Sequence, residues 1–68
     1  MINGRVKCYF HSKGYGFIED FDGREVYFHF SAVEGATAND IVIGAGVAFD
    51  VITTELGLEA FCVHLFAA

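Results

Sequence analysis

Residues 13–18 have the sequence Lys-Gly-Tyr-Gly-Phe-Ile, the stretch most informative about the fold. Tyr15 and Phe17 are two positions apart, so a strand places both rings on one face. Gly16 between them has no side chain to shield either ring, and Lys13 adds a positive charge nearby. Flat rings on an open sheet beside a cation suit stacking of unpaired nucleotide bases. The stretch therefore predicts a strand with an aromatic, nucleic-acid-binding face.

A second aromatic run, Val-Tyr-Phe-His-Phe, occupies residues 26–30. Asp22-Gly23 lies between the two runs, and Asp-Gly between alternating segments is a strong hairpin signal. Alternation along this second strand gives Val26 and Phe28 as inward residues, and Tyr27 and His29 as outward ones. Exposed aromatic side chains in a cluster usually mark a binding surface. The hairpin therefore extends the predicted aromatic face.

The rest of the chain also favours strands, because apolar residues mostly recur at a spacing of two and helix signals are almost absent. The predicted strands cover residues 3–10, 15–20, 25–30, 47–53 and 58–64. A long connection, residues 31–46, joins the third to the fourth. Five antiparallel strands of this length suit a small closed barrel, which leaves no sheet edge exposed. The predicted core consists of Val6, Ile18, Val26, Phe28, Val47, Phe49, Val51 and Val63.

Bulk composition indicates one small folded domain, residues 1–68. Hydrophobic residues make up 54% of the chain, which excludes disorder. No apolar run reaches the roughly 18 residues of a membrane span. The N-terminus also lacks the pattern of a signal peptide. We therefore expect a cytoplasmic protein that does not bind membranes.

Reactive and metal-binding groups form no recognisable pattern. Cys8 and Cys62 occur without a C-x-x-C motif, and the three histidines lack metal-ligand spacing. No phosphate-binding glycine loop and no set of nucleophile, base and orienting residue is present. The sequence therefore predicts free thiols, no metal, no cofactor and no catalytic site.

Charge is unevenly distributed along the chain. Residues 1–18 contain three basic residues and no acid, whereas residues 19–68 contain one arginine and nine acids. The net charge of −5 weakens long-range attraction to phosphate, although the first aromatic run lies in the basic segment. We expect weaker binding than a basic domain with the same aromatic face would show.

With both aromatic runs in this order and spacing, the sequence resembles the bacterial cold-shock proteins, single cold-shock domains built on the OB-fold. The resemblance extends without gaps from Gly4 to about Val63, and Ser31-Ala32-Val33 and Val47-x-Phe49 add to it. It implies a five-stranded antiparallel Greek-key barrel. It also implies binding of single-stranded RNA or DNA with little sequence preference.

The resemblance also implies roles for individual residues. Lys7 and Lys13 would meet the nucleic-acid backbone. The implied base contacts are Tyr9, Tyr15, Phe17, Tyr27, His29 and Phe30. The sequence does not distinguish RNA from DNA as the partner, because stacking ignores the 2′-hydroxyl.

Some positions depart from the family pattern. Cys8 and Ala38 replace a tryptophan and a phenylalanine that stack on bases in the family. At about 1–3 kcal/mol for each stacked base, the absence of both rings would weaken binding by roughly 2–6 kcal/mol. Phe10 stands where asparagine is usual, Leu56 where a basic residue is common and Leu58 where proline is common. These departures, the acidic total and an apolar C-terminal stretch support an alternative hypothesis. In it, a divergent domain with weakened nucleic-acid binding acts mainly through homodimerisation or a protein partner. The candidate surface comprises Leu56, Leu58, Phe61, Leu65 and Phe66.

Overall fold

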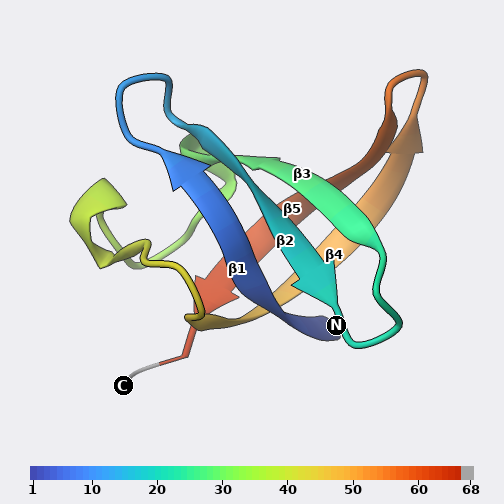
Figure 1. Cartoon of the computed structure of the whole chain (residues 1–68), viewed down its shortest axis with the longest axis horizontal. Helices are drawn as coiled ribbons and strands as arrows, with labels where there is room; N and C mark the ends of the chain where they lie inside the picture. The colour runs from blue at the N-terminus through green and yellow to red at the C-terminus, as the bar shows by residue number, and fades with distance from the viewer. Residues whose placement is uncertain (67–68) are drawn as a thin grey trace.

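The computed structural model describes residues 1–66 and shows a closed, five-stranded β-barrel (Figure 1). The strands are β1 (Ile2–Phe10), β2 (Tyr15–Asp20), β3 (Glu25–His29), β4 (Gly46–Thr54) and β5 (Gly57–Leu65). The predicted barrel is confirmed, and each strand boundary lies within one residue of its expected position. Residues 67–68 of the predicted domain lie outside the described part. No helix among the described residues is long and apolar enough to cross a membrane.

The strand order around the barrel is β1-β2-β3-β5-β4, with β4 paired back to β1. Four of the pairs are antiparallel, and β3 pairs with β5 in parallel, with Tyr27 opposite Glu59. A closed ring with an odd number of strands cannot alternate in direction all the way round. One parallel pair is therefore unavoidable, and the antiparallel prediction holds for the other four.

The core lies inside the barrel and matches the predicted set closely. All of the predicted core residues are buried except Val51, which is partly buried and packs against the core. Ile41 and Ala60 also belong to the core. Ile41 directly follows η2 (Ala38–Asp40), a short 3-10 turn in the long connection. That connection has no strand periodicity, so sequence reasoning missed Ile41.

A β-bulge at Lys7 changes which residues of β1 face inward. Val6 pairs with Ile18, but Cys8 pairs with Phe17, so Lys7 is the extra residue. A bulge shifts the alternation by one residue. Cys8 therefore lies on the outer face, and Tyr9, opposite Gly16, turns inward.

A second bulge, in β5, holds Cys62 in the left-handed region at φ +50°. It is the one non-glycine residue with positive φ in the described chain. The Glu34 carboxylate, which accepts a hydrogen bond from the thiol, raises the pKa of Cys62, and burial raises it further. The thiol is therefore held protonated, the form that is a poor nucleophile.

The backbone at Cys62 predicts a strong preference for small side chains. Cys62→Val is expected to lower the free energy of unfolding by about 1–2 kcal/mol, because a β-branched residue is strained in this region. Cys8→Val, in extended backbone, is the matched control and should change stability by less than about 0.5 kcal/mol. Urea unfolding measures both variants. Equal stability of the two would contradict the assigned backbone strain.

The turn between β2 and β3 is organised by Asp20, which is 4% exposed. Its carboxylate accepts hydrogen bonds from the backbone N–H of Asp22 and of Arg24, at 3.0 and 2.8 Å. The Arg24 guanidinium donates a further one at 2.7 Å. The backbone hydrogen bond from Arg24 is the main cause that lowers the pKa of Asp20, and the guanidinium adds to it.

A lowered pKa makes the ionised Asp20 carboxylate a source of stability at neutral pH. That stability is lost as the pH falls through the folded-state pKa, below about pH 4. Asp20→Asn is therefore expected to unfold at lower urea concentration at pH 7 and to lose less further stability on acidification. Asp22→Asn, at an exposed site in the same turn, is the control. A wild-type pH profile for Asp20→Asn would refute this account of the turn.

Candidate nucleic-acid interface

The outer surface of β1–β3, together with the residue that follows β3, carries a continuous group of aromatic side chains, here called the aromatic face. Its members are Phe10, Tyr15, Phe17, Tyr27, His29 and Phe30, all half-buried or exposed. They face outward because the inward positions of β2 and β3 are taken by Gly16, Ile18, Val26 and Phe28. The structure therefore brings together five of the six aromatic residues predicted from the sequence and adds Phe10.

The rings lie close enough to form one surface. Tyr15 is central, with ring centroids 5.3 Å from Phe10, 6.3 Å from Phe17 and 5.7 Å from Tyr27. The Cα of Tyr15 also pairs with that of His29, whose ring lies 5.1 Å from Phe30. The rings are mostly tilted or edge-on to one another, so π-faces remain open to an incoming planar group.

Tyr9 is the predicted aromatic that the structure separates from this group. Its ring stacks at 5.8 Å on Phe28, a buried core residue, and contacts His11 edge-on at 4.7 Å. Regular alternation would have placed Tyr9 outward, and the bulge at Lys7 reverses it. The same bulge turns Phe10 outward. A bulge leaves no clear mark in a single sequence, which is why Phe10 was missed. Contact between Tyr9 and nucleic acid stays a prediction.

The two predicted lysines have different surroundings. Lys7 donates a hydrogen bond of 2.9 Å to Glu25, an exposed ion pair that raises the pKa of Lys7 above its ordinary value. Lys13 lies in the turn between β1 and β2 and forms no ion pair within residues 1–66. Lys13 is thus available to a phosphate, whereas Lys7 must first leave Glu25.

The turn that carries Lys13 is tied directly to the aromatic face. The carbonyl of Phe10 accepts hydrogen bonds from the backbone N–H of Lys13 and of Gly14, at 3.0 and 2.8 Å. The Gly14 carbonyl in turn accepts from the N–H of Phe30 at 2.9 Å. Gly14 has φ +76°, and a Cβ there would press on the Phe30 ring. The lysine and the end of the aromatic face are therefore held together by backbone geometry.

His29 ends β3 and positions Phe30. Its Nδ1 accepts the backbone N–H of Ser31 at 3.1 Å, which stops the strand and starts the 3-10 turn η1 (Phe30–Ala32). The expected strand to residue 30 is thus one residue too long. Phe30 leaves the sheet and lies 47% exposed at the edge of the face.

The two positions that lack the family's usual rings are separate in the fold. Cys8 lies on the outer surface opposite Phe17, and Ala38 opens η2 in the long connection. Both cysteines are free thiols. Within residues 1–66, no group of three or more His, Cys, Asp or Glu side chains is placed to hold a metal ion.

Comparisons with known proteins agree with the fold. The family model described as "'Cold-shock' DNA-binding domain" matches residues 2–66. Cold shock protein CspD of Bacillus subtilis is 38% identical over 60 residues, covering 88% of this chain and 91% of the relative. Cold shock protein 1 of Lactiplantibacillus plantarum is 40% identical, with the same coverage.

A solved structure titled "drosophila Unr CSD456" superposes with a TM-score of 0.78 at 27% identity. The match covers 97% of this chain and 26% of that larger one. A family model over nearly the whole described chain and relatives at this level of identity lead to one conclusion: the chain belongs to the cold-shock domain family.

Proposed function

We propose that this protein binds single-stranded RNA or DNA by stacking bases on the aromatic face, without catalysis, in the cytoplasm. The observation that carries the proposal is the cluster of neighbouring, partly exposed rings on β1–β3. Core packing does not account for them, because Ile18, Val26 and Phe28 already fill the inward positions of these strands. Membership in a family whose model is described as DNA-binding supports the same conclusion.

In this proposal the phosphates lie beside Lys13, and Lys7 contributes only when it exchanges Glu25 for a phosphate. Exposed ion pairs contribute only about 0–1 kcal/mol, so the exchange of Glu25 for a phosphate costs little free energy. The net charge of −5 opposes the approach of a polyanion. We therefore expect stacking to supply most of the affinity and electrostatics to modulate it.

Fluorescence anisotropy of a labelled oligouridine, titrated at two salt concentrations, tests this function. Lys13→Gln is expected to reduce the slope of log affinity against log salt by about 0.7, the value for one phosphate contact on a single strand. Lys7→Gln, the matched comparison, should reduce it less. A folded domain that binds no strand at low salt would defeat the proposal.

A second candidate function is self-association. The surface predicted for it is divided, because Leu56 lies at the tip of the β4–β5 hairpin and Phe66 follows the other end of β5 (Figure 1). At the Phe66 end, a groove of about 590 Å³ is lined in part by Val42 and Phe66, and neighbouring Ile43 is 75% exposed. We propose homodimerisation through this end as the alternative. Light scattering that finds only a 7.4 kDa species at micromolar concentration would reject it.

A further inference from the structure

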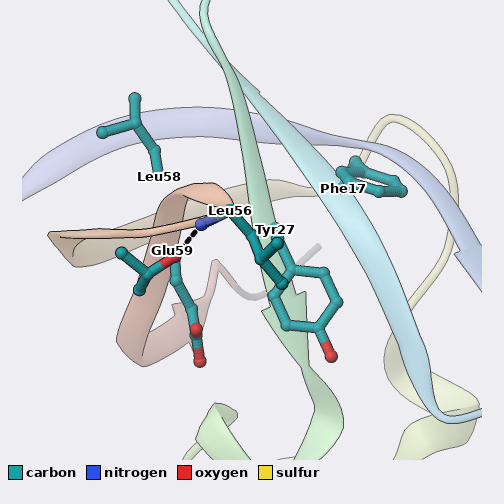
Figure 2. Close-up of a pocket in the computed structure, with 6 residues that line it drawn as sticks. Phe17, Tyr27, Leu56, Leu58 and Glu59 are labelled. Carbon is teal, nitrogen blue, oxygen red and sulfur yellow. Dashed lines mark hydrogen bonds between the residues drawn. The ribbon is translucent and has the colours of Figure 1, made fainter.

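A groove of about 500 Å³ opens where the aromatic face meets the β4–β5 hairpin (Figure 2). Its lining residues are Phe17, Tyr27, Thr54, Leu56, Leu58 and Glu59. Phe17 and Tyr27 belong to the aromatic face as well, with ring centroids 6.0 Å apart and planes at 71°. A single-stranded nucleic acid that lies across the aromatic face would therefore continue into this groove.

Among residues 1–66, Glu59 is the one charged residue that lines the groove. It pairs with Tyr27 across the parallel β3–β5 seam, and its carboxylate extends in the same direction as the Tyr27 ring (Figure 2). Within residues 1–66 no side chain forms an ion pair or a hydrogen bond with this carboxylate. Its acceptor capacity is therefore unused, unlike that of Glu25, which is engaged by Lys7.

The lining favours a base over a phosphate. Leu56 and Leu58 are apolar, and Tyr27 offers a ring face. The negative charge of Glu59 repels the phosphates of a nucleic-acid backbone. A base that stacks on Tyr27 can direct its Watson–Crick edge toward Glu59, since these edges are free in a single strand. An ionised carboxylate only accepts hydrogen bonds, so it discriminates among base edges by their donors.

We propose that Glu59 makes this groove a guanine-selecting subsite that disfavours uracil and thymine. The inference rests on the proposed function and adds a specificity to it. Guanine presents adjacent N1–H and N2–H donors, which match the two carboxylate oxygens in a bidentate pair. Uracil and thymine present one N–H between two carbonyl oxygens, which the carboxylate repels. Cytosine and adenine have one amino donor each, so their expected affinity for the groove lies between that of guanine and that of uracil or thymine.

The test compares seven-nucleotide labelled RNA strands, a length within the roughly 4–16 nucleotides covered by one OB barrel. One strand is all uridine, and the others carry a central guanosine or inosine. Inosine keeps N1–H but lacks the amino group, so it isolates the second hydrogen bond. Wild-type protein is expected to bind the guanosine strand about tenfold more tightly than the uridine strand, near the lower end of the discrimination typical of a bidentate contact.

Glu59→Gln should reduce this preference to about twofold and bind the uridine strand more tightly than wild type, because the repulsion is removed. Glu55→Gln removes one charge from the same hairpin outside the groove and should leave the preference unchanged. Equal affinity of the wild type for guanosine and uridine strands, or a preference that survives Glu59→Gln, would overturn the assignment. Failure of folded wild type to bind any strand would instead defeat the proposed function.

Discussion

Replacing Phe17 and Tyr27 together by alanine is expected to weaken binding of single-stranded nucleic acid by about 2–6 kcal/mol, since one base stacked on an aromatic ring is worth about 1–3 kcal/mol. Both rings are half-buried on the outer surface and lie 6.0 Å apart. Both rings also line the groove beside Glu59, so the double variant loses stacking on the aromatic face and in the groove.

Anisotropy titration with oligouridine measures the loss, and far-UV circular dichroism checks that the barrel remains folded. Phe61→Ala is the matched control, because Phe61 is 40% exposed on β5 and forms no ring pair with the aromatic face. It should bind as wild type does. Wild-type affinity in the folded double variant would show that bases do not stack on these rings.

Phe28→Ala is expected to lower the free energy of unfolding by about 3–5 kcal/mol, the usual range for deleting a buried ring. Phe28 is 1% exposed and supports the Tyr9 ring, which stacks on it at 5.8 Å. A domain of 68 residues has a total stability of roughly 3–10 kcal/mol, at about 0.05–0.15 kcal/mol for each residue. This single change therefore removes a large part of the stability.

Urea unfolding followed by circular dichroism measures this effect. Tyr27→Ala, one residue earlier on β3, is the control, because the two side chains lie on opposite faces of the same strand. Tyr27→Ala should unfold near the wild-type urea concentration and lose affinity, whereas Phe28→Ala should unfold at a much lower urea concentration. If both variants unfold at the same urea concentration, the assignment of faces on β3 is wrong.

The pairing of β2 with β3 was predictable because every signal there is local. Asp22-Gly23 marks the hairpin, and strict alternation separates Ile18, Val26 and Phe28 from the outward rings. Because side chains alternate between the two faces of a strand, a spacing of two residues identifies the face reliably wherever the pairing register is regular. The inward and outward residues of these two strands therefore followed from the sequence without correction.

The surroundings of Lys7 and Tyr9 could not be predicted in the same way. The bulge at Lys7 reverses the facing of every later residue in β1, and one sequence contains no pattern that marks it. The ion pair between Lys7 and Glu25 joins residues 18 positions apart. Such contacts depend on how the sheet twists and closes.

The groove beside Glu59 also forms only when the barrel closes. The parallel seam between β3 and β5 brings Glu59 opposite Tyr27, although 32 positions separate them in the chain. Nothing in the local sequence of the β4–β5 hairpin indicates that this carboxylate adjoins the aromatic face. The further specificity proposed for the interface thus became visible only in the folded barrel.

Nuclear magnetic resonance mapping of an oligouridine titration tests most directly whether the aromatic face is the binding surface. We predict that amide signals of Tyr15, Phe17, Tyr27 and Phe30 shift progressively with added strand. Signals from the β1–β4 seam, where Asn3 pairs with Ala48, should stay in place. Shifts centred on that seam, with the signals of the aromatic face unmoved, would contradict the account.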